Sequence, residues 1–252
     1  MSHKESQITL VLLLLLAGVV LSSEPSTTPI YETMDPKALQ QATSLMQIRN
    51  YLSYAVNMDI VFLVDVSYNT TQYLTPLAAL GKLATSCLTG MREGNNKIAL
   101  ITFGNTSRLE YGFRECFKEG CLKNVSDTVM ERSEGRKIGK GLRYAKRLLK
   151  KEQRDYKKGS HQNHPRKQCI VLVTFGVDVS ENEFPMVPRI LGNGIDMIVI
   201  GVGKNAAKDE ATLNSITKPY TKQSKRSGMI LVTEHSEYLF TLLENAVKYT
   251  CF

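Results

Sequence analysis

Residues 58–69 read MDIVFLVDVSYN, and this stretch decides the fold. The run 60–64 is too apolar for a strand with one wet face, so it predicts a strand buried on both faces, as in parallel sheets. Asp65 and Ser67 follow at its carboxyl end, with Asn69 two residues further on. Open parallel sheets bind their ligands at that edge. Carboxylate, hydroxyl and amide oxygens suit a hard divalent cation, so these three residues form a candidate metal site.

Strands and helices alternate along the rest of the chain. Further strands are predicted at 97–103, 169–174, 195–201 and 229–233, with 108–113 as a short edge strand in a hairpin with 97–103. Helices are predicted at 70–88, 125–132, 138–154, 182–191, 209–217 and 236–249. Such alternation predicts an α/β fold, a Rossmann-like doubly wound and mostly parallel sheet with one antiparallel edge strand and helices on both faces.

Several blocks in order resemble von Willebrand factor type A domains. They are Asp65-Val66-Ser67 with its strand, then 97–104, 135–142, 170–174 and 194–203, so that the resemblance covers 57–251. It implies a ligand site at the carboxyl edge of the sheet, where the family places its metal-ion-dependent adhesion site. It also implies a role in adhesion or matrix assembly, generally without enzymatic activity.

The chain departs from the family pattern at the metal site. Asn69 replaces the last Ser of Asp-x-Ser-x-Ser, Arg136 stands where a loop Thr is usual, and Phe175 stands where an Asp is usual. A cation held only by Asp65 and Ser67 would bind weakly. We therefore expect no cofactor, with weak Mg²⁺ or Mn²⁺ binding as the alternative, and an internal ion pair between Arg136 and Asp65 in place of the metal.

The amino-terminal part of the chain predicts secretion. A polar lead containing Lys4 precedes an apolar run at 8–21 and small residues at 22–23, the pattern of a signal peptide at 1–23. The run is short for a membrane span, so an uncleaved anchor is the weaker alternative and no span is expected after cleavage. Residues 24–56 are predicted as a linker and a leading helix at 35–54, which either packs on the domain or contacts a partner. The domain is expected at 57–252, outside the cell.

Cysteines and sequons support this compartment. A local disulfide is expected between Cys116 and Cys121, and Cys251 could pair with Cys87 or with another chain. Cys169 lies in an apolar strand and is predicted to be a buried free thiol. An odd total of five cysteines leaves at least one unpaired or linked to another chain. The N-glycosylation candidates are Asn69, Asn105 and Asn124.

Positive charge is concentrated in one segment of the chain. The net charge is +8, and residues 136–167 contain thirteen Lys and Arg against two acidic residues. The segment is either a solvated helix face with a basic loop or a surface for heparan sulfate or another polyanion. Nucleic acid is excluded as a partner by the expected compartment. The polyanion-binding candidates are Lys140, Arg143, Lys146, Arg147, Lys150 and Lys151.

These observations predict a secreted, non-enzymatic adhesion or extracellular-matrix protein whose partner is an extracellular protein or a glycosaminoglycan. The four histidines have no carboxylate or cysteine nearby in the sequence that would complete a hydrolytic or metal set. Two alternatives remain open. One is a structural matrix component that oligomerises through an unpaired cysteine, and the other is a metal-dependent adhesion domain.

Overall fold

The structure is a computed structural model, and it describes residues 37, 40, 41, 43, 44, 47, 48, 58–67, 97–113, 133–159, 166–178, 194–218 and 228–234. The predicted helices 70–88, 125–132, 182–191 and 236–249 lie outside these residues. So do the segment 1–23, Asn69, Asn124 and the cysteines at 87, 116, 121 and 251. No helix of the described part of the chain is long and apolar enough to span a membrane.

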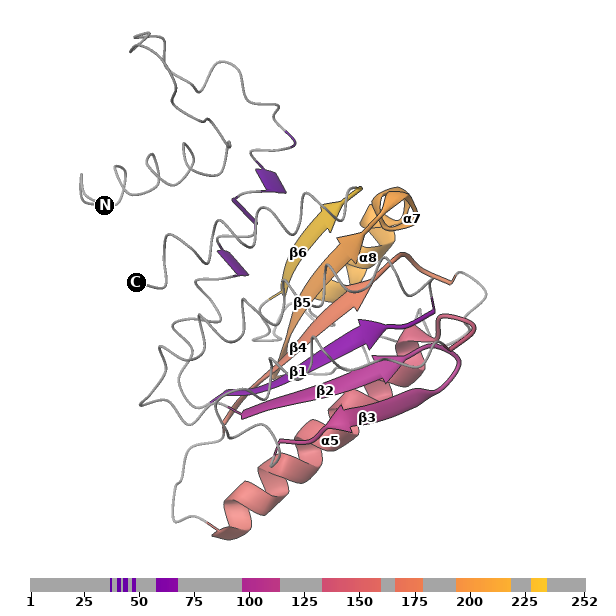
Figure 1. Ribbon diagram of the computed structural model, residues 1–252. Coiled ribbons are helices and arrows are strands. Elements are labelled where there is room, and N and C mark those ends of the chain that lie inside the picture. Colours follow the sequence, from indigo (N-terminus) through magenta and orange to yellow (C-terminus); the bar gives the residue numbers. More distant parts are fainter. Residues whose placement is uncertain are drawn as a thin grey trace, which may run out of the picture.

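Six strands form one mixed sheet in the order β3-β2-β1-β4-β5-β6 (Figure 1). The strands are β1 (Met58–Asp65), β2 (Lys97–Phe103), β3 (Ser107–Tyr111), β4 (Lys167–Thr174), β5 (Ile195–Val202) and β6 (Gly228–Thr233). Only β3 is antiparallel to its neighbour, and the other four pairings are parallel. The fold class predicted from the sequence is therefore confirmed.

The helices that the structure describes in the carboxyl-terminal part are α5 (Ile138–Gly159), α7 (Lys204–Lys208) and α8 (Glu210–Thr217). α5 runs five residues past its predicted end, because the Lys-rich segment after Arg154 continues the helix, and cations suit a helix carboxyl terminus. α8 matches the predicted helix at 209–217. The short α7 was not predicted, because Gly203 before it reads as a turn residue and has a φ of 90°.

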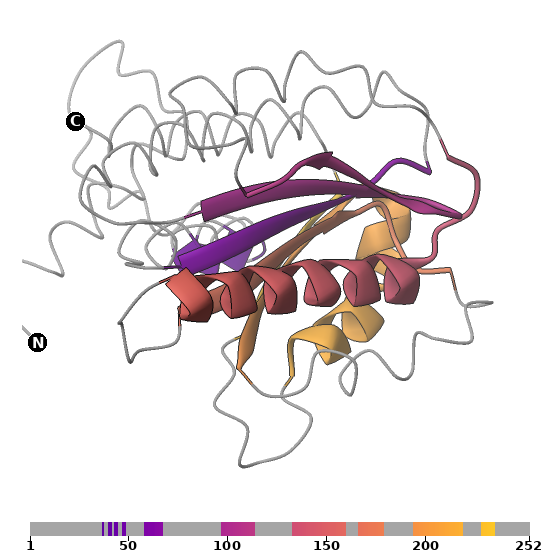
Figure 2. The same ribbon diagram turned by 90° about the horizontal axis from the view of Figure 1, so that it is seen from below.

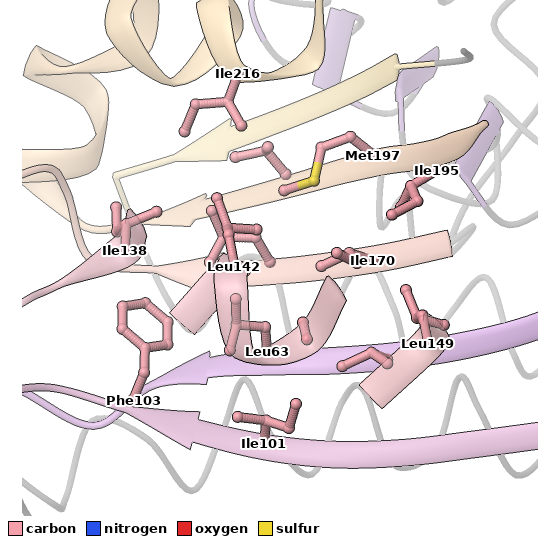
Figure 3. Packing of buried hydrophobic residues seen from close by; sticks show 14 of the residues in the cluster. Leu63, Ile101, Phe103, Ile138, Leu142, Leu149, Ile170, Ile195, Met197 and Ile216 are labelled. Carbon is pink, nitrogen blue, oxygen red and sulfur yellow. The ribbon is translucent and has the colours of Figure 1, made fainter. Parts of the chain in front are cut away.

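The core fills the space between the sheet and these helices. α5 packs on β1 and β2, whereas α8 packs on β5 and β6, and Figure 2 shows both helices on the same side of the sheet. Leu142 and Leu149 of α5 meet Leu63, Ile101 and other strand side chains in a fully buried cluster (Figure 3). Leu142 and Leu149 are two helical turns apart, in keeping with the 3.6-residue period that predicted this helix.

The opposite face of the sheet is buried as well. Ile60, Val171 and Ile198 alternate with the residues that face α5, and each is fully buried. Cys169 lies on this face as a free and buried thiol, as predicted, and its burial raises its pKa. A strand sequence without polar alternation is thus explained by a sheet covered on both sides.

Described residues of the leading helix contact the domain. These residues are helical. Gln41 donates a hydrogen bond from Nε2 to the carbonyl oxygen of Val232 in β6 at 2.8 Å, and Lys37 Nζ lies 3.3 Å from Glu234 Oε1. Ile48 is fully buried. Residues 37, 41, 44 and 48 share the spacing of one helix face, so this face is directed at the domain.

Candidate functional site

Asp65 ends β1 at the point where the strand order reverses, between β1 and β4. Ligands of doubly wound sheets bind at such switch points. The carboxylate is fully buried. Its Oδ1 accepts hydrogen bonds from the backbone N–H of Ser67 at 2.9 Å and from Ser67 Oγ at 2.5 Å. Two of the three residues that the sequence assigned to a metal site, Asp65 and Ser67, are therefore hydrogen-bonded to each other, and the third, Asn69, lies outside the described residues.

The other oxygen of Asp65 faces β4 and the loop before α5. Oδ2 accepts from Arg136 Nε at 2.6 Å and from the backbone N–H of Phe175 at 3.2 Å. The Thr174 hydroxyl lies 3.0 Å from Oδ2 and 2.7 Å from the carbonyl oxygen of Gly176, so its single proton is shared between two acceptors. The two N–H groups of the backbone, the Ser67 hydroxyl and Arg136 Nε together supply four donors, which fill the four lone-pair positions that a carboxylate offers. The Thr174 hydroxyl is a partial fifth donor.

Arg136 is held over Asp65 by the loop that precedes α5. The backbone N–H of Ser133 donates to Val66 O at 3.1 Å, and that of Lys137 donates to Gly104 O at 2.9 Å, so the loop is fastened at both ends. The Arg136 side chain is 14% exposed, and its Nε also lies 3.1 Å from Ser67 Oγ. The internal ion pair that the sequence suggested is present in the structure.

A glycine makes room for this guanidinium. Gly176 has a φ of 135°, and a Cβ built there would lie 3.3 Å from Arg136 Nη1 and 3.0 Å from Asp209 Oδ2. A side chain at position 176 would thus be strained and would crowd both groups. The turn after β4 therefore fits the guanidinium closely.

The nearby carboxylates are also engaged. Asp209 Oδ2 accepts from the backbone N–H of Val177 at 2.8 Å, and Asp178 Oδ2 lies 3.3 Å from Lys137 Nζ. The side chain of Phe175, where the family usually has an Asp, is buried at 4% exposure. Within the described ranges, no cluster of three His, Cys, Asp or Glu side chains is placed to hold a metal ion.

The residues at this edge do not fit the divalent cation that the fold family implies. Hard cations need six or more oxygen ligands with free lone pairs, several of them anionic. Here Asp65 is saturated with donors, and a guanidinium carries the positive charge beside it. A metal ion would have to displace Arg136 and would meet repulsion from it.

The basic helix candidates lie on α5, away from Asp65. Lys140, Arg143, Arg147, Lys150 and Lys151 are exposed, whereas Lys146 is half-buried. Partial burial, with a contribution from Lys150, lowers the pKa of Lys146. Asn105, the one glycosylation candidate within the described residues, is exposed in the turn between β2 and β3.

A second group of charges, at the opposite edge of the sheet, was not recognised in the sequence. Arg166 Nε lies 2.6 Å from Asp59 Oδ1, both side chains are buried, and Arg166 Nη2 donates to Met58 O at 3.2 Å. Lys97 pairs with Glu152 of α5 next to them. Burial raises the pKa of Asp59 despite Arg166. The sequence held a signal for this group, because Asp59 is the second residue of a strand that is apolar from 60 to 64, and a buried charge needs a partner.

The chain matches solved structures at low identity. Proximal thread matrix protein 1 from the mussel byssus, solved with a zinc-occupied MIDAS motif, has a TM-score of 0.57 at 19% identity. The PilB minor pilin from Streptococcus sanguinis has a TM-score of 0.52 at 13% identity, and the SpaC pilus adhesin from Lactobacillus rhamnosus GG has 0.55 at 12%. The match to the thread matrix protein covers 78% of this chain and 48% of that chain. The match to the minor pilin covers 78% and 62%, and the match to the pilus adhesin covers 77% and 30%, in the same order. These likenesses show the fold.

A comparison with curated proteins gives no match. The sequence model of the von Willebrand factor type A domain matches residues 59–236, which include the Asp65 site and all six strands except Met58, the first residue of β1. With the sheet order and the position of Asp65 at the switch point, this match establishes that the chain belongs to the von Willebrand factor type A domain family.

Proposed function

We propose that this protein is a secreted, non-enzymatic adhesion or extracellular-matrix binding protein that works without a metal ion. Its domain would extend over 57–252 after removal of a signal peptide, and its partner would be an extracellular protein or a glycosaminoglycan. The observation that carries the proposal is the 2.6 Å contact between Arg136 Nε and the buried Asp65 Oδ2. The chain supplies its own cation where the family binds a dissolved one.

The family and the neighbours support the adhesive part of this proposal. Type A domains generally serve adhesion or assembly and not catalysis, and the fold neighbours include a thread matrix protein and a pilus adhesin. The saturated hydrogen bonding of Asp65 supports the metal-independent part. Because the chain spans about half of the thread matrix protein, the activity of that whole protein is not transferred.

Adhesion of protein-coated beads would test the proposal. Beads carrying the full glycosylated chain are placed on decellularised extracellular matrix and washed under shear, in buffer with Mg²⁺ and Mn²⁺ or with EDTA. We expect equal retention in both buffers and well above that of albumin-coated beads. Retention that disappears in EDTA would show a metal-dependent adhesion domain, and retention no higher than that of albumin would refute adhesion.

Calorimetry separates the metal question from adhesion. We expect no heat of binding when Mg²⁺ or Mn²⁺ is titrated into the wild-type chain, because Arg136 already neutralises Asp65. A measurable affinity that is lost in an Asp65→Ala variant would contradict the proposal. The oligomeric alternative is tested separately, since disulfide-linked multimers would separate on a gel once a reductant is added.

A further inference from the structure

Over residues 138–155 of α5, whose side chains the structure describes, the exposed side chains are all positively charged, and the second carboxylate, Asp155, is half-buried. Each of these exposed side chains is a lysine or an arginine. We call these residues the basic stripe, and its members are Lys140, Arg143, Arg147, Lys150, Lys151 and Arg154. The sequence showed a basic segment, but only the structure shows which of its cations share one surface.

The basic stripe is narrow, straight and long. At about 100° per residue, its six members fall within an arc of about 100° on the side of α5 opposite the buried Leu142 and Leu149. With a rise of about 1.5 Å per residue, the stripe from Lys140 to Arg154 is about 21 Å long. Figure 2 shows α5 running along the outside of the sheet as one continuous helix.

Some charged side chains of the segment 136–167 form ion pairs inside the domain, and others are exposed on the basic stripe. Arg136 pairs with Asp65, Lys137 with Asp178 and Arg166 with Asp59. Glu152, one of only two acidic residues in the segment, turns inward to Lys97 and is buried. Arg136, Lys137 and Arg166 are thus bound internally, while every exposed side chain that the structure describes on α5 is a cation.

This arrangement costs stability in the free protein. Arg143 and Arg147, Arg147 and Lys151, and Lys150 and Arg154 are each four residues apart, and like charges at that spacing destabilise a helix. A helix face that serves only for solubility usually mixes acidic with basic residues. The side chains of this face repel each other, and an anionic partner that lies along the stripe would relieve the repulsion.

The composition of the stripe selects the kind of polyanion. Protein interfaces are centred on buried aromatic or aliphatic anchors, and single-stranded nucleic acids stack their bases on aromatic side chains. Among the described side chains of α5, at 138–155, no exposed position carries an aromatic or aliphatic residue, and Tyr144 and Leu148 are half-buried against the core. We propose that the basic stripe is the docking surface for a linear sulfated polysaccharide, which lies along α5 and is bound by its sulfate groups. This inference deepens the proposed function, because it relies on the extracellular setting given there.

A matched pair of variants tests this docking surface. The stripe variant carries Arg147→Gln, Lys150→Gln and Lys151→Gln. The control carries Lys204→Gln, Lys208→Gln and Lys218→Gln, which are exposed positions on or next to α7 and α8. Both lose three positive charges. Affinity of the full chain for size-fractionated heparin is measured in EDTA at several salt concentrations.

We expect the stripe variant to bind heparin about a hundredfold more weakly at low salt, since one basic side chain at an anionic surface contributes roughly fivefold. Its affinity should also depend less steeply on salt, because fewer counterions are released. The control should lose less than about threefold. Equal losses in the two variants, or no binding by the wild type, would overturn the inference.

Two further arms identify the chemistry of the ligand. Chemically desulfated heparin should bind much more weakly than heparin, and polyglutamate of equal charge should not compete with it. Competition by polyglutamate at equal charge would assign the stripe to acidic proteins and overturn the inference. Heparin binding with failed matrix adhesion would count against the proposed function alone, whereas adhesion without heparin binding would count against the stripe alone.

Discussion

Asp65 shows how a basic side chain supplied by the same chain can take the place that a metal ion has beside a carboxylate. A buried carboxylate must be neutralised by a metal ion, a proton or a basic side chain. Here Arg136 reaches it from a loop 71 residues away and approaches to 2.6 Å. Gly176 leaves the space that the guanidinium needs. The binding edge of the sheet is therefore charge-balanced before any ligand arrives.

The Asp65–Arg136 pair makes a testable contribution to stability. We expect Arg136→Met to lower the free energy of unfolding by about 3 kcal/mol, because a buried carboxylate would be left without its cation. In the double variant Asp65→Asn/Arg136→Met, no charge remains and most of the loss should be recovered. Urea denaturation followed by circular dichroism measures both. An Arg136→Met chain as stable as the wild type would show that solvent or a bound ion neutralises Asp65.

At the scale of elements, α5 joins two opposite electrostatic roles in one helix. Its inner side carries Glu152, which joins Lys97, Asp59 and Arg166 in a buried charge group at the amino-terminal edge of the sheet. Its outer side carries the basic stripe. Asp59 Oδ2 has no hydrogen-bond partner among the described residues, so this charge group is incompletely satisfied.

The Asp59 group predicts a pH dependence. Burial raises the pKa of Asp59, so the folded chain holds this proton more tightly than the unfolded chain does. The resulting stabilisation is complete below the ordinary pKa of 3.8 and is lost as the pH rises through the higher folded value. Asp59→Asn does not titrate. The unfolding free energy of Asp59→Asn minus that of the wild type should therefore increase as the pH rises from 3.8 through the higher folded pKa of Asp59.

Urea titrations at several pH values between the acid limit and neutrality would measure this difference. Lys97, Glu152 and Arg166 are unchanged in the variant, so their contributions largely cancel in the comparison. A constant difference between the two chains at all pH values would contradict a raised pKa at Asp59.

At the scale of the whole molecule, the leading helix contacts the sheet of the domain that follows it. Gln41 contacts β6, and Ile48 is fully buried. We expect Ile48→Ala to lower the free energy of unfolding by about 2 to 4 kcal/mol, since it removes buried methyl groups and leaves a cavity. Lys37→Ala removes an exposed side chain whose ion pair with Glu234 is open to solvent, and it should change the free energy of unfolding by less than about 1 kcal/mol. Equal effects of the two substitutions would contradict this packing.

The local sequence determined the elements and their type. The apolar runs that became β1, β2, β4, β5 and β6 have no polar alternation, and this pattern is typical of strands covered on both faces. The 3.6-residue period of α5 identified its buried side. The order of the family blocks then indicated the sheet, since alternating strands and helices close in few topologies. Element ends were less certain, as at α5, because capping and tertiary contacts set them, and the short α7 was missed.

Tertiary structure decided which charges meet. Asp65 and Arg136, Asp59 and Arg166, and Lys97 and Glu152 are separated by 71, 107 and 55 residues. Their partners follow from the strand order and from how α5 crosses the sheet, which no local pattern records. The sequence suggested the first pair through the family motif but did not reveal the other two. Likewise, the sequence contained the cations of the basic stripe, and only the packed helix determined which of them face the solvent together.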